Sequence, residues 1–280
     1  MSIIEEAVRK TAQRHHGRAP GAQPIAPRAR SRKTATPPVN ASAARSFQRA
    51  PLDEEALARN LVLPQVRDAG ALRAYKILRT RMLRRLEVSQ ARSFVVSGVT
   101  EGDGKTLTAL NLAIALAQDV NTWVFLVDLD LHRSRIASYL GIGGDKGLSD
   151  YLVGEATLDE VVYAPDIPRF AVVPNFRAAP QASELLSSPR MSEFLAALES
   201  EQPRRIIVFD MPPLLAADDV LAFAPQTDGL LLVVSEGGTG RDALKSAKEI
   251  LSEMNLLGVV LNRSAERNDS AYYSYAYQQT

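Results

Sequence analysis

From residue 93 onward, apolar residues gather in short continuous runs, and helical patterns separate one run from the next. The runs are almost free of polar residues, which is typical of strands covered on both faces. Between them, apolar residues recur at three- and four-residue spacing, which indicates amphipathic helices. The predicted strands cover residues 93–98, 122–128, 170–174, 205–210, 229–234 and 257–262, and the clearest helices cover residues 106–118, 190–200 and 241–254. This alternation predicts an α/β fold with a mostly parallel central sheet and helices on both faces.

The chain before residue 93 has a different character. Residues 66–87 (VRDAGALRAYKILRTRMLRRLE) place apolar side chains at helical spacing with arginines between them, which predicts a further helix. Residues 15–52 are rich in Pro, Ala and Arg without an apolar period, which predicts a disordered linker. We therefore divide the chain into a short N-terminal helix (1–14), a basic linker (15–52), a folded domain (53–264) that includes helix 66–87, and a flexible tyrosine-rich tail (265–280).

The composition excludes several kinds of site. The chain has no cysteine, so disulfides, thiolate metal sites, iron–sulfur clusters and cysteine nucleophiles are excluded. Its histidines are His15, His16 and His132, too few to predict a histidine-built zinc site. No run approaches the roughly 20 apolar residues that a transmembrane helix needs. We therefore expect a cytoplasmic protein.

Charge is distributed unevenly along the chain. Residues 1–52 contain ten Lys and Arg against two Asp and Glu, whereas the remainder is acidic on balance, although the whole chain carries a net charge of +1. A basic arm would attract anionic lipid or nucleic acid, but a solvated tether is the simpler interpretation. We expect no nucleic-acid partner.

A glycine-rich loop follows the first predicted strand and ends in Gly-Lys-Thr (SGVTEGDGKT). Backbone N–H groups of such a loop, and of the helix that follows it, bind phosphate, and glycines let the backbone approach the anion. Lys105 would neutralise the β- and γ-phosphates of ATP, and the Thr106 hydroxyl would bind Mg²⁺. The strict phosphate-loop pattern is not met, because Val99 stands where a glycine is expected. The residues predicted to contact the nucleotide here are Glu101, Gly102, Asp103, Gly104, Lys105, Thr106 and Leu107.

Aspartates stand at the ends of two further predicted strands. Asp128 and Asp130 end the strand 122–128, and Asp210 ends the strand 205–210. Ligands bind at the carboxyl ends of the strands in such sheets. Neighbouring carboxylates repel one another unless a cation or a proton lies between them. We therefore predict a magnesium site built from Thr106, Asp128 and Asp210, with a carboxylate of the Asp128–Asp130 pair available as a base.

Three segments, in this order, resemble the nucleotide motifs of the bacterial tyrosine kinases, whose fold is related to the MinD/ParA-type P-loop ATPases. They are GVTEGDGKT, LVDLDLHRS and VFDMPPLLAADDVLAFAPQTDGLLLVV, and FRAAPQASELLSS is similar to a further segment of that family. The tail YYSYAYQQT, with half of the eight tyrosines, resembles the family's autophosphorylation cluster. More loosely, MSIIEEAV and the separate format are similar to the autokinases that accompany exopolysaccharide and exosortase gene systems.

The resemblance implies a protein-tyrosine autokinase that uses ATP and Mg²⁺ and regulates exopolysaccharide synthesis or export. It implies that Lys105 stabilises the transferred phosphoryl group, that Asp128 takes the proton of the tyrosine hydroxyl, and that Asp130 supports the metal or the substrate. Asn262 matches a position at which relatives contact adenine. The implied phosphate acceptors are Tyr272, Tyr273, Tyr275 and Tyr277.

The resemblance also implies partners. Relatives form rings in which the tail of one subunit enters the next subunit's site, and they need a transmembrane activator, often a polysaccharide co-polymerase. We therefore expect a homo-oligomer at the inner face of the membrane, activated by a separate membrane protein. The family's interface helix carries Glu-x-x-Arg-x-x-Arg, but the matching residues here are Arg73, Lys76 and Arg79, so the pairing between subunits must differ. His132 and Ser134 also replace a frequent Arg and Pro.

Two other interpretations stay open. A nucleotide-switched ATPase of the MinD/ParA type would share the fold, but such proteins usually carry a lysine near the start of the loop, where this chain has Thr100. A non-catalytic scaffold for a membrane polysaccharide complex would bind nucleotide only for stability. Nucleotide binding by Lys105→Ala separates the scaffold from both enzymes, and phosphotyrosine separates the kinase from the ATPase.

Overall fold

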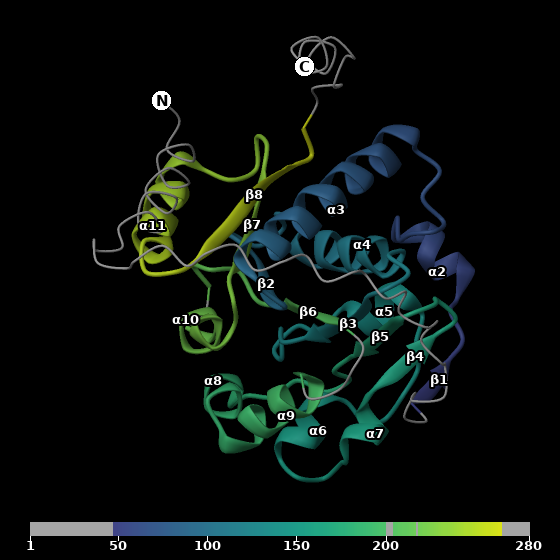
Figure 1. Cartoon of the computed structure of the whole chain (residues 1–280). Coiled ribbons are helices and arrows are strands. Elements are labelled where there is room, and N and C mark those ends of the chain that lie inside the picture. Colours follow the sequence, from purple (N-terminus) through teal and green to yellow (C-terminus); the bar gives the residue numbers. More distant parts are fainter. Residues whose placement is uncertain (1–46, 200–203, 217, 265–280) are drawn as a thin grey trace, which may run out of the picture.

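The computed structural model describes residues 47–199, 204–216 and 218–264, and Figure 1 shows their arrangement. The described residues build an 8-stranded sheet with helices on both of its faces. The predicted fold class is therefore confirmed. The predicted N-terminal helix (1–14), most of the predicted linker and the tyrosine-rich tail (265–280) lie outside the described residues.

The strand order in the sheet is β1-β4-β5-β3-β6-β2-β7-β8. Neighbouring strands are parallel, except that β4 and β5 are antiparallel. The strands are β1 (Gln48–Ala50), β2 (Ser93–Gly98), β3 (Trp123–Asp128), β4 (Tyr163–Pro165), β5 (Phe170–Val173), β6 (Arg205–Asp210), β7 (Leu230–Ser235) and β8 (Leu256–Asn262). The apolar runs of the sequence match all of these except β1 and β4, which have 3 residues each and are too short to show a pattern. β1 lies at the end of the range predicted as linker.

The helices follow the strands as the sequence pattern indicates, with several short ones added. They are α2 (Glu54–Arg59), α3 (Ala69–Ser89), α4 (Lys105–Ala117), α5 (Ile136–Leu140), α6 (Leu148–Leu152), α7 (Leu158–Val161), α8 (Ala182–Leu186), α9 (Pro189–Glu199), α10 (Asp219–Phe223) and α11 (Arg241–Leu251). α3 begins later than predicted because the Asp68 carboxylate accepts a hydrogen bond from the Ala71 N–H at 2.6 Å and caps the helix. It ends at Gln90, which adopts a left-handed conformation with φ of 57°.

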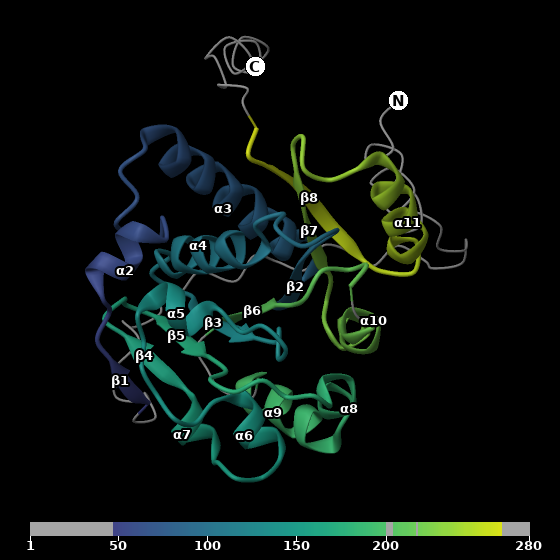
Figure 2. The ribbon, with the colours of Figure 1, turned by 180° about the vertical axis from the view of Figure 1, so that it is seen from behind.

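Side chains of each central strand alternate between two hydrophobic clusters, one on each face of the sheet. In β2, Phe94 and Val96 belong to one cluster, and Val95 belongs to the other. α3 and α4 cover the first face, and α6 and α8 to α11 cover the second, as the two opposite views show (Figures 1 and 2). Both faces are therefore dry, which explains why the strands read as continuous apolar runs.

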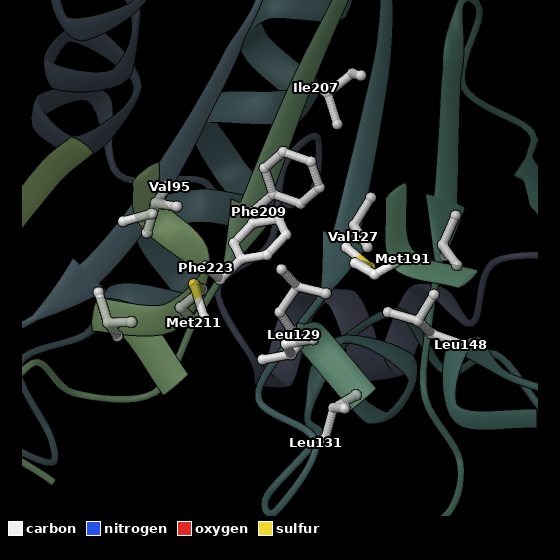
Figure 3. Close-up of a cluster of buried hydrophobic side chains, with 14 of the residues drawn as sticks. Val95, Val127, Leu129, Leu131, Leu148, Met191, Ile207, Phe209, Met211 and Phe223 are labelled. Atoms are coloured by element: carbon white, nitrogen blue, oxygen red, sulfur yellow. The ribbon is translucent and has the colours of Figure 1, made fainter. Parts of the chain in front are cut away.

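The cluster on the second face packs aromatic side chains edge to face. Phe209 of β6 and Phe223 of α10 have ring centroids 4.9 Å apart and ring planes at 73° (Figure 3). Both rings are fully buried. Met191 and Leu148 lie farther along the same cluster, beside Val127 (Figure 3). This packing fixes α10 and the loop before it against the carboxyl end of β6.

The register of the central strands brings three strand ends together. Asp128 of β3 lies opposite Asp210 of β6, and Asp210 also lies opposite Val96 of β2. The loop that follows β2 therefore emerges beside both aspartates. None of the helices in the described part of the chain is long and apolar enough to cross a membrane.

Candidate active site

The loop between β2 and α4 has the backbone shape of a phosphate-binding loop. Gly102 and Gly104 adopt φ of 84° and 89°, a conformation that strongly favours glycine. Gly104 is also the N-cap residue of α4, and no side chain caps this end of the helix. The N–H groups of the first turn, together with the helix dipole, therefore favour an anion at this end of α4.

Lys105 places its ammonium group among carboxylates. Its Nζ lies 2.8 Å from Asp130 Oδ2, 3.7 Å from Asp210 Oδ1 and 3.3 Å from Thr106 Oγ. The lysine thus joins the phosphate loop to the ends of β3 and β6. Burial alone would lower the pKa of Lys105, but Asp210 and Asp130 outweigh it and raise that pKa, so the side chain stays charged.

Asp210 is fully buried, and no hydrogen bond from the described residues reaches either of its carboxylate oxygens. A buried carboxylate without donors is costly, and a cation or a proton relieves that cost. Burial raises the pKa of Asp210, while the charge of Lys105 and the neighbouring Thr106 hydroxyl oppose the rise. The orphaned oxygens beside Lys105 and Thr106 fit a hard cation such as Mg²⁺, which prefers oxygen ligands and keeps several waters or phosphate oxygens. Within the described ranges, no three His, Cys, Asp or Glu side chains form a metal-binding cluster by themselves.

The aspartate pair is divided between two tasks. Asp128 accepts backbone N–H hydrogen bonds from Asp130 at 3.2 Å, Arg135 at 3.1 Å and Ile136 at 3.2 Å, and so holds the turn between β3 and α5. Asp130 instead binds Lys105 and accepts the Arg133 N–H at 3.0 Å. Their adjacency in the sequence suggested that the two carboxylates share one cation or proton. In the structure, their hydrogen-bond and ion-pair partners differ. Burial, with Asp210 adding to it, raises the pKa of Asp128 well above its ordinary range.

The other residues predicted to bind nucleotide differ in their exposure to solvent. Glu101 pairs with Arg133 at 2.6 Å, but both side chains are 63% exposed, so this pair contributes little to stability. Leu107 is half-buried and packs on the α4 face of the sheet. Asn262, which relatives would place near adenine, donates from Nδ2 to the Asp103 carbonyl at 2.9 Å. The predicted contacts of these side chains with nucleotide stay predictions.

Two contacts at this edge of the sheet were not predicted from the sequence. Thr239 donates its hydroxyl to Asp103 at 2.7 Å, and the two residues are 136 positions apart. His132 Nε2 lies 3.6 Å from Asp219 Oδ2, and the buried Asp219 also accepts the Ser183 hydroxyl at 2.7 Å. His132 and Ser183 stand in segments quoted for the resemblance, but a single Thr, Ser or His carries no sequence signal that identifies its partner. The tyrosines predicted as phosphate acceptors lie outside the described residues.

Comparison with known proteins identifies a matching family and similar proteins. Residues 94–280, which include the phosphate loop, the three aspartates and Asn262, match the CbiA family, described as the CobQ/CobB/MinD/ParA nucleotide binding domain. The tyrosine-protein kinase YwqD of Bacillus subtilis (strain 168) is 30% identical over 203 residues, which is 72% of this chain and 84% of YwqD.

Two more proteins extend this likeness. The tyrosine-protein kinase CpsD of Streptococcus agalactiae serotype Ia is 30% identical over 174 residues, or 61% of this chain and 74% of CpsD. Among solved structures, the kinase domain of the Escherichia coli tyrosine kinase ETK superposes with a TM-score of 0.63 at 26% identity, over 71% of this chain and 77% of that domain. Sequence and structure comparisons thus agree with one another.

Proposed function

This chain belongs to the bacterial tyrosine-protein kinases, and on that premise we propose that it transfers the γ-phosphoryl group of ATP to its own C-terminal tyrosines. The proposed acceptors are Tyr272, Tyr273, Tyr275 and Tyr277. The observation that carries the proposal is the position of Lys105. Its buried ammonium stands at the N-terminus of α4, within 4 Å of two carboxylates, where a transferred phosphoryl group needs a fixed positive charge.

Each residue of the site has a distinct proposed task. The N–H groups after Gly104 and the Lys105 ammonium orient and neutralise the phosphates. Thr106 and Asp210 hold Mg²⁺, which when bound screens the charge of the phosphates. Asp130 keeps Lys105 in place through the 2.8 Å ion pair. Phosphoryl transfer needs this positioning and neutralisation more than it needs covalent chemistry.

Asp128 is the proposed base for the tyrosine hydroxyl. Burial raises the pKa of its carboxyl group, and a carboxylate of raised pKa holds a proton better than an ordinary one. The Arg135 and Ile136 N–H groups, which bind Oδ2, fix the side chain in one orientation. Asp128→Asn should therefore lower the rate of transfer more than it lowers nucleotide affinity.

The proposed setting follows from the family. We propose that the tail of one copy enters the site of another, that a separate transmembrane polysaccharide co-polymerase activates the protein at the inner face of the membrane, and that phosphorylation regulates exopolysaccharide synthesis or export. The names of the relatives support a kinase. The partner, the membrane association and the polysaccharide link are our proposals.

The intact mass of the purified protein after incubation with Mg²⁺-ATP tests the function. We expect mass steps of one phosphate on the wild type, and no steps on Lys105→Met or on a variant with all four tail tyrosines replaced by Phe. Tyr139→Phe is the matched control, because Tyr139 is a half-buried tyrosine of α5 that should keep full phosphorylation.

Two outcomes would contradict the proposal. Phosphate on the four-Phe variant would place the acceptor elsewhere. ATP hydrolysis that depends on Lys105 but adds no phosphate, even with a membrane activator present, would identify a switch ATPase instead.

A further inference from the structure

A hydrogen-bonded link joins the phosphate loop to the loop Ser235–Gly240, which connects β7 to α11. The Thr239 hydroxyl donates to Asp103 Oδ1 at 2.7 Å and accepts the Ser235 N–H at 2.9 Å. A hydroxyl has one proton to give, and an ionised carboxylate can only accept. The direction of both hydrogen bonds is therefore fixed, and the link runs from the end of β7 to Asp103.

The same carboxylate closes the phosphate loop on itself. Asp103 Oδ2 accepts the Val99 N–H at 2.9 Å and the Thr100 N–H at 2.8 Å. Asp103 is only 2% exposed, so its oxygens are hydrogen-bonded by these donors and by Thr239 rather than by water. The shape of the loop from Val99 to Gly104 thus depends on where this one carboxylate is held.

β8 supplies a second contact to the same stretch. Asn262 Nδ2 donates to the Asp103 carbonyl at 2.9 Å. A Cβ at residue 104 would overlap the Asn262 amide, so Gly104 is required by this approach as well as by its positive φ. The side chain of Asp103 is therefore bound by the loop after β7, and its main chain is bound by the last residue of β8.

We propose that Thr239 is a positioning residue for the kinase: through the Asp103 carboxylate it holds the phosphate loop in the form that receives the phosphates of ATP. Without the hydroxyl, Asp103 Oδ1 loses its 2.7 Å donor and keeps only the long 3.4 Å contact from the Thr100 hydroxyl, in a buried place where a poorly paired carboxylate is costly. The carboxylate then competes for N–H groups that the phosphates need, and its negative charge opposes theirs. The inference rests on the proposed function only in naming ATP, because any nucleotide with these phosphates would meet the same loop.

The test compares Thr239→Val, which keeps the shape of the side chain and removes the hydroxyl, with Thr239→Ser, which keeps the hydroxyl. We expect Thr239→Val to weaken Mg²⁺-ADP binding by roughly tenfold and to raise the KM for ATP by a similar factor, with a smaller effect on kcat, because one hydrogen bond to a charged group is lost. Thr239→Ser should stay within about twofold of the wild type. In the nucleotide-free protein, Thr239→Val should also speed amide exchange at Val99 and Thr100.

Thr227→Val is the matched control. The Thr227 hydroxyl donates to the Ala224 carbonyl at 2.9 Å just before β7, at the amino end of the strand whose carboxyl end leads to Thr239. Its loss should lower the unfolding temperature without changing the dissociation constant of Mg²⁺-ADP.

Two results would overturn the proposal: unchanged Mg²⁺-ADP affinity in Thr239→Val, or an equal loss of affinity in Thr239→Ser. Both are measured by calorimetry and need no kinase activity. A wild type that binds Mg²⁺-ADP but forms no phosphotyrosine would therefore refute the proposed function, while the comparison of the two variants would still decide the role of Thr239.

Discussion

Lys105 is the residue on which the site depends, because it is the cation that the structure places among three buried aspartates. Its ammonium lies 2.8 Å from Asp130 and 3.7 Å from Asp210, and Asp128 also raises its pKa. One positive charge cannot balance three negative ones, so at least one carboxyl group is stable only with a proton or a further cation. Burial raises the pKa of both Asp128 and Asp210, and the charge of a neighbouring aspartate adds to the rise in each case.

Asp210→Asn should make the nucleotide-free protein more stable, although it removes a carboxylate that we propose holds Mg²⁺. The pKa of Asp210 is higher in the folded state than in the unfolded state. The folded protein is therefore not destabilised by Asp210 at a pH below the unfolded pKa, where the carboxyl group is protonated in both states, and it loses stability as the pH rises through the folded pKa. We therefore expect the variant's advantage to be near zero at about pH 4 and to grow toward pH 7, where it reaches roughly 1–2 kcal/mol.

Chemical unfolding without Mg²⁺ or nucleotide, across that pH range, measures this difference. Asp219→Asn serves as the comparison, because Asp219 is also buried, but its Oδ1 accepts the Ser183 hydroxyl at 2.7 Å and His132 Nε2 lies 3.6 Å from its Oδ2. That variant should gain no stability. An advantage of Asp210→Asn that falls with rising pH would contradict our account of the site.

Among the elements, α4 connects the site to the rest of the domain. It begins at the phosphate loop, and apart from its half-buried first residues nearly every side chain is buried between the sheet and α3. Asn111 in the middle of α4 accepts the Leu63 N–H at 2.8 Å and donates to the Leu61 carbonyl at 3.0 Å. This buried side chain fixes the segment between α2 and α3 on the outer face of α4.

Asn111→Ala should therefore lower the free energy of unfolding by about 2–3 kcal/mol, because it leaves a buried N–H group and a carbonyl group without partners. Urea unfolding monitored by circular dichroism measures the change. Gln118→Ala is the control, since it removes an exposed 2.9 Å hydrogen bond to Arg79 from the end of α4. The control should change stability by less than about 0.5 kcal/mol. Equal effects of the two variants would mean that the buried contact is not the anchor.

For the whole molecule, the distribution of charge is the feature that most affects association with other molecules. α3 carries one acidic residue, Glu87, against six basic ones on an otherwise acidic domain: Arg73, Lys76, Arg79, Arg81, Arg84 and Arg85. It lies on the outside of the α4 layer (Figures 1 and 2). A helix face of one sign repels a copy of itself and attracts an acidic surface.

Arg73→Glu should strengthen self-association, because it places an acidic residue at the position where the family's Glu-x-x-Arg-x-x-Arg motif has its Glu. Opposite charges could then meet between subunits. Sedimentation velocity at low and high salt measures the mass, and added salt should reduce the gain. Arg84→Glu is the control, since it changes charge equally on the same exposed helix outside the motif. If both variants associate alike, net charge rather than the motif position sets the assembly.

The amino-acid sequence by itself determined the layout of this protein. Continuous apolar runs, helical periodicity and the Gly-Lys-Thr loop are local patterns, and each depends on neighbours within a few residues. For that reason the sheet, the long helices and the phosphate loop were predictable. The strands β1 and β4 were not, because a 3-residue strand is decided by its partner strand and leaves no period to detect.

Only the tertiary structure decided how the site's side chains are paired. Asp128 and Asp130 are two residues apart, yet one caps a backbone turn and the other binds Lys105. Asp210 lies opposite Asp128 because β6 is the neighbour of β3, and Asp103 meets Thr239 because β7 lies beside β2. Lys105 and Thr239 are each more than 100 positions away from Asp210 and Asp103, their respective partners. Burial and hydrogen-bond partners, rather than residue type, determine the charge state and the task of a carboxylate.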